Sequence, residues 1–425
     1  MAKNDKSANR RMEALLHLRS PNLVEEFVSL LGDADPYLAN AAIEILGTPA
    51  NSPLLLGTAR AKPSVAMRIG LLVALRRTGD AKARQAVPEF LADPDPGVRR
   101  AAIQWAAEVK QAELAAAVHD AGLRPPVTRE LLEAWAKAEE MLAGSKSKSE
   151  DASPAIADLL ENPKTPPAVK AIALRMLPAD HPKLTAGLLA ELLRSDDAVK
   201  REVVRTLVVR ADAPSQALLR RIALDESVPI PLRALAVTGL GHSLESPETK
   251  SVWQKLRDHP QLRRRYSAEQ KRTADEWRKA LATQAGDPSA GERVFFSPTG
   301  PGCYKCHQID NRGASVGPDL TFIGKATGRD KLIESILDPS KEVAPAYTAW
   351  RITTRDGKER VGLITGETFD SFVQVVDSRG QVEKIRRTDI EDRAALPKSI
   401  MPDELPNLMT RQEFLDLIAF LLERK

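Results

Sequence analysis

The sequence has 425 residues and a formal net charge of +4, and 43% of its residues are hydrophobic while only 4% are aromatic. This length suggests about three domains, and a composition rich in Ala and Leu with few aromatic residues favours helices over a β-sandwich. The near-neutral charge argues against a dedicated nucleic-acid-binding protein. No run of about 18 apolar residues is present, so we expect no membrane span.

A short pattern recurs between residues 10 and 245. An acidic or proline-containing turn is followed by an apolar residue, a basic residue and then an apolar helix. The clearest copies are at 93–102, 166–173 and 196–203, and weaker copies are at 33–38, 62–65 and 228–233. Asp and Pro suit these turns because they begin helices and cannot continue them. A period of about 30 to 40 residues with two helices per unit resembles HEAT-like repeats, in which stacked helix pairs bury each other's apolar stripes. An irregular helical bundle is the alternative.

Two connecting regions follow from composition. Residues 143–154 are small and charged, which predicts a flexible linker within the repeats. Residues 246–285 predict connecting helices, and the expected buried anchors are Trp253, Leu256, Trp277 and Leu281. The second region also carries a basic cluster made of Arg263, Arg264, Arg265, Lys271, Arg272, Arg278 and Lys279. Because acidic residues are interspersed, a solvated helical face is favoured over a docking surface for an acidic partner.

The two cysteines of the chain, Cys303 and Cys306, are followed directly by His307. The pattern C-x-x-C-H is typical of c-type haem attachment, in which each thiol bonds a haem vinyl group and the imidazole binds the iron. A structural zinc site would need four ligands, and the remaining histidines lie upstream at no ligand spacing. A redox dithiol is the other alternative, although the preceding segment 298–302 has no buried strand before it.

Several elements flank this motif. Asp287 and Pro288 predict the start of a helix, and residues 331–337 predict a short amphipathic helix. β-branched runs at 350–354, 361–365, 372–376 and 382–385 alternate with turn signals at 355–358 and 377–380. They predict an antiparallel sheet of about four strands, inserted at about 345–392. A capping box at Thr410–Glu413 predicts a last helix with an apolar stripe.

These motifs together resemble a known family. Gly291-x-x-x-Phe295, the C-x-x-C-H motif, Gly317-Pro318-Asp319-Leu320, Met401-Pro402 and a terminal helix with Phe420 resemble a class I c-type cytochrome. The segment 286–425 resembles more closely the planctomycete-type haem-binding domain, which often follows HEAT-like repeats and has a similar insertion. The resemblance covers about a third of the chain.

The resemblance implies a role for each matching residue. Cys303 and Cys306 would hold one haem c covalently, with His307 as proximal ligand and Met401 as distal ligand. The Pro318 carbonyl would accept a hydrogen bond from His307 Nδ1, which fixes the imidazole tautomer. Gly317 and Leu320 belong to the same loop motif. Gly291 and Phe295 would form the contact between the first and last helices, with Gly291 permitting close approach of Phe420 or Leu417.

The distal ligand has alternatives. Met401 lies in a loop before proline, where a ligand loop would lie. Met409 lies near a helix start, where methionine is more often a core filler. A third alternative is that no methionine binds the iron. Ligation by His and Met fills both axial positions and suits electron transfer.

We therefore expect a mainly α-helical protein, with a HEAT-like solenoid followed by a class I cytochrome c-like domain that contains a small antiparallel β insertion. The expected function is electron transfer to or from a redox partner protein. A dehydrogenase is one candidate partner, and the helical repeats would supply protein contacts. The alternatives are a peroxidase-type haem enzyme, an electron-accepting module of a dehydrogenase complex and an interaction scaffold with a structural haem.

The location follows from the motif. Covalent haem attachment normally takes place outside the cytoplasmic membrane, so we expect a periplasmic or otherwise exported protein. Residues 1–6 are polar with no apolar stretch after them, which predicts that this sequence contains no signal peptide.

Overall fold

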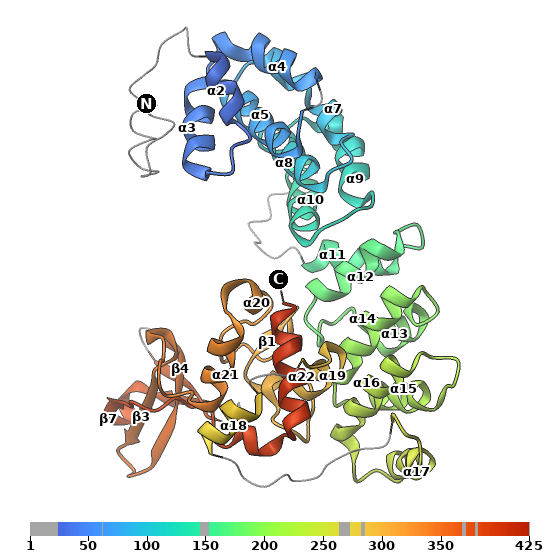
Figure 1. Ribbon diagram of the computed structural model, residues 1–425, viewed down its shortest axis with the longest axis vertical. Coiled ribbons are helices and arrows are strands. Elements are labelled where there is room, and N and C mark those ends of the chain that lie inside the picture. Colours follow the sequence, from blue (N-terminus) through green and yellow to red (C-terminus); the bar gives the residue numbers. More distant parts are fainter. Residues whose placement is uncertain are drawn as a thin grey trace. The chain divides into compact units, whose positions relative to one another are not determined.

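The chain divides into two compact units, Met1–Met176 and Leu177–Lys425. The computed structural model describes residues 24–61, 63–144, 153–262, 273–281, 285–367, 371–378 and 381–424. These residues are mainly helical (Figure 1) and include a five-stranded antiparallel sheet and a separate two-stranded antiparallel pair. This confirms the predicted class, a mainly α-helical protein with a small antiparallel sheet. The unit boundary lies inside the segment 10–245. The segment 286–425 therefore shares the second unit with helices from the second half of the predicted repeats.

The first unit is built of helices that pack mainly on their sequence neighbours. Helix α5 packs against α3, α4 and α8, and α8 packs against α7, α9 and α10. The helices of this unit are α2 Val24–Leu30, α3 Pro36–Leu46, α4 Ser52–Arg60, α5 Val65–Thr78, α6 Ala81–Arg84, α7 Val87–Leu91, α8 Pro96–Glu108, α9 Ala115–Leu123, α10 Arg129–Leu142, α11 Ser153–Glu161 and α12 Pro167–Met176. The predicted linker falls between α10 and α11, and its residues 145–152 lie outside the described part of the chain.

The second unit has three groups of elements. Its first helices are α13 Ala186–Leu192, α14 Asp197–Val208, α15 Ala213–Leu224, α16 Ile230–Gly239 and α17 Pro247–Leu256. Helix α18 Ala274–Leu281 follows. The last group contains α19 Pro288–Phe295, α20 Ile323–Ala326, α21 Arg329–Leu337 and α22 Arg411–Leu422, together with all the strands. Among the described residues, no helix combines the length and apolar character that crossing a bilayer requires.

The recurrent sequence pattern has a structural explanation. Each copy begins a helix, namely α3, α5, α8, α12, α14 and α16. The basic residue of the pattern donates to carbonyls at helix ends: Arg99 Nε to Ala121 O at 2.9 Å, Lys170 Nζ to Leu160 O at 3.1 Å and Arg233 Nε to Ala223 O at 3.0 Å. The last carbonyls of a helix have no partner within that helix. A cation at this place in these three units therefore satisfies acceptors that the packing would otherwise leave buried and unpaired, whereas Lys200 of the copy at 196–203 pairs with Asp197 on the surface.

The connecting region agrees only partly with expectation. Leu256, Trp277 and Leu281 are buried, but Trp253 is only half-buried, and Val252 fills the core position of α17 instead. Within the basic cluster, 263–265, 271 and 272 lie outside the described residues. Arg278 forms an exposed ion pair with Asp275 at 2.8 Å, and Lys279 is exposed.

Helices α19 and α22 cross closely, as the sequence predicts. A Cβ atom on Gly291 would lie 1.9 Å from Asp416 O and 2.7 Å from Phe420 Cβ. The ring of Phe295 lies 5.8 Å from that of Phe420 between centroids. Asp287 caps α19, and the capping box of Thr410 and Glu413 opens α22. These local predictions are confirmed.

The inserted sheet has five antiparallel strands in the order β6-β5-β4-β3-β7. They are β3 Ala349–Thr354, β4 Glu359–Glu367, β5 Phe372–Val376, β6 Val382–Arg386 and β7 Ile390–Ala395. The first four match the predicted runs. The prediction of about four strands is one short, because β7 contains three consecutive charged residues, 391–393, and lacks the alternation that identifies a strand. The sheet buries Ile352, Val373, Val375 and Ile385.

Candidate functional site at the C-x-x-C-H turn

Both cysteines lie on one short helical turn. Residues Cys303–Lys305 form the 3-10 helix η6, which Gly302 precedes in the left-handed conformation at φ +65°. The backbone N–H groups of Cys306 and His307 donate to Cys303 O at 3.2 and 2.9 Å. Cys303 and Cys306 are free thiols and are half-buried. The turn therefore presents two thiols and an imidazole from neighbouring positions.

The His307 imidazole is held by the backbone of the following loop. Its Nδ1 lies 2.9 Å from Pro318 O, the contact that the resemblance implies. The loop returns to the turn because the N–H groups of Val316 and Gly317 donate to Cys306 O at 3.0 and 2.7 Å. With Nδ1 as the donor, Nε2 keeps its lone pair. No hydrogen bond joins Nε2 to any residue in the described ranges.

Two glycines make room for this arrangement. A Cβ atom on Gly317 would lie 2.7 Å from His307 Cε1 and 2.9 Å from Nδ1, so the ring rests directly on the glycine. Gly313 has φ +107°, and its Cβ would lie 2.3 Å from His307 O. Gly313 ends strand β2, Arg312–Gly313, which pairs with β1, Gln308–Ile309. The chain after His307 therefore folds back tightly on the motif.

The environment favours neutral side chains. Burial lowers the pKa of His307, and the hydrogen bond with Pro318 opposes that shift. Neutral imidazole is the form that binds metals. Burial raises the pKa of Cys303 to about 12. It also raises the pKa of Cys306, where the Asp377 carboxylate adds to the effect. A reactive redox dithiol needs a lowered thiol pKa, so the electrostatics do not suit that alternative.

The raised pKa of Cys303 predicts slow alkylation in the haem-free protein. At pH 8, raising the thiol pKa from its ordinary value of 9.0 to about 12 lowers the fraction of thiolate by roughly three orders of magnitude. The higher nucleophilicity of the remaining thiolate recovers part of this, for a net slowing of about 50-fold. We expect this difference between native and denatured Cys306→Ser protein, which leaves Cys303 as the single thiol. The native rate should rise as the pH approaches 12. Equal native and denatured rates at pH 8 would contradict the prediction.

Two residues near the motif carried no sequence signal. Tyr304 fills a variable position of the motif, yet it is buried and its ring contacts His242 and Phe296 with centroids 6.2 Å away in each case. Asp377 lies after β5, and its effect on the pKa of Cys306 brings a turn of the inserted sheet into electrostatic range of the motif. Both contacts depend on tertiary folding.

The other predicted site residues occupy varied positions. Phe295 is fully buried. Leu320 is half-buried, and its N–H donates to Gln308 O at 2.9 Å. Met401 is half-buried in the loop after β7, where its N–H donates to Ser399 Oγ at 3.1 Å. Met409 is buried at 3% exposure, as a core residue would be. Within the described ranges no hydrogen bond joins Met401 to the C-x-x-C-H turn, and its role as a ligand stays a prediction.

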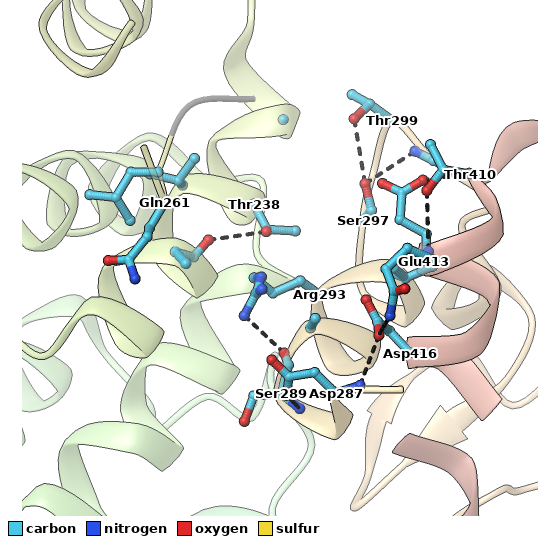
Figure 2. Close-up of a pocket in the computed structure, with 18 of the residues that line it drawn as sticks. Thr238, Gln261, Asp287, Ser289, Arg293, Ser297, Thr299, Thr410, Glu413 and Asp416 are labelled. Atoms are coloured by element: carbon cyan, nitrogen blue, oxygen red, sulfur yellow. Dashed lines mark hydrogen bonds between the residues drawn. The ribbon is translucent and has the colours of Figure 1, made fainter. Parts of the chain in front are cut away.

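A separate cleft of about 810 Å³ opens in the second unit, between the α16–α17 region and α19 with the start of α22. Its lining includes Thr238, Gln261, Asp287, Arg293, Thr410, Glu413 and Asp416, which Figure 2 shows. Many of these polar groups bond to one another: Asp287 N donates to Asp416 Oδ1 at 2.8 Å, and Arg293 donates to Ser289 O at 3.0 Å. Neither the two thiols nor His307 line the cleft, so it is distinct from the C-x-x-C-H site.

In the part of the chain that the structure describes, no three or more His, Cys, Asp or Glu side chains gather as a metal site would require. No family model and no curated protein match the sequence. A solved structure of human deoxyhypusine hydroxylase in complex with glycerol is similar at 18% identity and a TM-score of 0.24, covering 56% of this chain and 91% of that chain. A TM-score this low carries no argument about fold or function.

Proposed function

We propose that this protein is an exported electron-transfer cytochrome with one covalent haem c, in which a class I cytochrome c-like domain follows HEAT-like repeats. The observation that carries the proposal is the His307 Nδ1–Pro318 O hydrogen bond beside two thiols on one turn. That bond orients the imidazole and leaves Nε2 available as a ligand. When bound, haem would supply one-electron redox chemistry.

The residues present suit such a group. Cys303 and Cys306 would form the two thioethers, and both are free thiols. His307 would supply the proximal nitrogen, and burial favours its neutral form. The absence of a side chain at Gly317 gives the imidazole its place against the loop. The two sulfur atoms, the imidazole nitrogen and the space for the ring are separate requirements of haem attachment, and all of them are met at this one turn.

Met401 completes the proposal as the distal ligand. It is half-buried in a loop, whereas Met409 is committed to the core. His307 and Met401 would together hold the haem iron, and this pair of ligands would raise the reduction potential and suit electron transfer to a partner protein. The helical repeats would supply the surface for that partner, and a dehydrogenase is a chemically reasonable one.

The direct test is expression in the bacterial periplasm together with c-type maturation proteins. We expect a mass increase of one haem that survives denaturation, and a low-spin visible spectrum. The Cys303→Ser/Cys306→Ser variant provides the matched control and should lack the covalent increase. A wild-type protein without any haem mass would overturn the proposal.

The position of Asp377 predicts the direction of a change in reduction potential. Its negative charge favours the oxidised, more positive haem, so Asp377→Asn should raise the potential by a few tens of mV in the haem-loaded protein. Potentiometric titration measures this shift, which should shrink at high salt. Asp356→Asn is the control, because Asp356 lies in the β3–β4 turn and pairs with Lys358. An unchanged potential in Asp377→Asn would show that the sheet turn has no electrostatic influence on the haem.

A further inference from the structure

A buried network of charges lies within the second unit, outside the C-x-x-C-H turn itself. Glu202 of α14 is fully buried. Its Oε1 accepts from Arg205 NH1 at 2.7 Å, and its Oε2 lies 3.0 Å from Arg312 NH2. The Arg312 side chain is only 2% exposed. Charged side chains are rarely buried so completely unless they are paired.

This network joins a helix of the repeats to the segment that carries the motif. Arg312 belongs to β2, the strand that returns the chain after His307. Directly after β2, the N–H of Ala314 donates to Tyr304 O at 2.8 Å, and the loop then reaches Pro318. Fixing the Arg312 side chain therefore also fixes the loop after β2, which places the Pro318 carbonyl.

Two further contacts of α14 reach the same segment. At its C-terminal end, Val208 O lies 3.2 Å from His242 Nε2, and the His242 ring makes an edge contact with Tyr304 inside the motif. On its side, Arg205 NH2 donates to Glu292 Oε2 of α19 at 2.9 Å. One helix thus contacts, directly or through His242, the segment before, within and after the C-x-x-C-H turn.

The charged nature of this contact indicates that it fixes the position of the Arg312 segment in addition to stabilising the packing. Apolar side chains of similar volume would hold two surfaces together at least as well as buried ions. Charged groups add direction, because the Arg312 guanidinium also donates to Glu202 O at 3.3 Å and Thr206 Oγ1 at 3.4 Å. A side chain with several acceptors on one helical turn has few alternative placements.

We propose that helix α14 is a positioning element that holds the C-x-x-C-H turn in its folded form before haem is attached. The link to haem attachment rests on the proposed function, whereas the positioning of the turn does not. In this arrangement the repeats do more than display the cytochrome-like domain. They supply part of the framework for its ligand loop.

Hydrogen exchange in the haem-free, full-length protein tests this inference. The amides of Ala314, Val316 and Gly317 should be protected in the wild type. Glu202→Gln should lower their protection about 100-fold, because it leaves the Arg312 charge buried without its counter-ion. The conservative variant Arg312→Lys keeps the charge, and protection of the same amides should fall by about 10-fold. Lys200→Gln is the matched control on the same helix, since Lys200 forms only an exposed pair with Asp197.

The pattern of exchange decides the outcome. If the loss of protection is concentrated at residues 314–317 and the amides of α22 are unchanged, the result supports the proposal that α14 positions the C-x-x-C-H turn. Wild-type protection in both variants, or an equal loss throughout the second unit, would overturn it. If Glu202→Gln does not fold, Arg312→Lys alone carries the comparison. If the wild type takes up no haem during maturation, the proposed function fails while the exchange result still stands on its own.

Discussion

Replacing Met401 by leucine should remove the His/Met signature of the haem-loaded protein and lower its reduction potential by roughly 200 mV. A thioether ligand stabilises ferrous haem, and axial ligands set haem potentials over a wide range. Leucine has a similar volume and no donor atom, so the loop should keep its fold while the haem would lose the sulfur that Met401 supplies. Visible absorption in the region of the methionine-to-iron charge-transfer band, together with potentiometric titration, measures both effects.

Met409→Leu is the control for this prediction. Met409 is buried where η9, Leu405–Leu408, leads to α22, and leucine is a volume-conserving replacement there. The spectrum and the potential should remain those of the wild type. If Met409→Leu removes the signature instead, the ligand assignment moves to Met409. If neither substitution changes it, the haem has no methionine ligand.

Local signals in the sequence predicted much of the structure. Asp287, Thr410 and Glu413 form the expected caps because capping depends on residues within one turn. The predicted turn at 355–358 is present, and its Gly357 has a left-handed conformation at φ +76°. The His307–Pro318 contact was also expected, although from a family resemblance rather than from spacing alone. Each of these features joins residues that lie close together in the sequence.

The features that were missed depend on distant partners. Strand β7 has no strand-like alternation and exists because it pairs with the edge of β3. Glu202 and Arg312 each look like ordinary surface charges in the sequence, and only folding reveals that they are buried together. Tyr304 occupies a position that the motif leaves undefined. Its packing against His242 is visible only when the repeats and the motif are seen in one unit.

This dependence on folding also changes the picture of the domain organisation. The contacts of α14 with Arg312 and Glu292 cross the segment boundaries that composition suggests. The segment that resembles a cytochrome therefore forms its compact unit together with the later repeat helices. A partner that binds those helices would contact the same framework that holds His307.

The close contact between α19 and α22 predicts a large loss of stability on substitution of Gly291. Gly291→Ala should lower the free energy of unfolding of the second unit by about 3 kcal/mol or more. The added Cβ would meet Asp416 O at 1.9 Å, and that atom belongs to the backbone of α22, which cannot move alone. The gain of at most about 1 kcal/mol in helix propensity cannot compensate. Urea unfolding followed by circular dichroism, with hydrogen exchange in α22 to identify the unit, measures the change.

Gly187→Ala should have the opposite sign within the same unit. Gly187 is an exposed helical glycine of α13, and its added Cβ would meet a single atom in ordinary contact, Thr185 Oγ1 at 3.8 Å. Alanine there should stabilise by about 0.5 kcal/mol, through a smaller loss of backbone entropy. Both substitutions add one methyl group to a helical glycine. The difference between their effects on the free energy of unfolding therefore measures the cost of disturbing the close contact between α19 and α22. A Gly291→Ala protein as stable as the wild type would mean that α19 and α22 can separate without cost, and the close approach would then have no structural role.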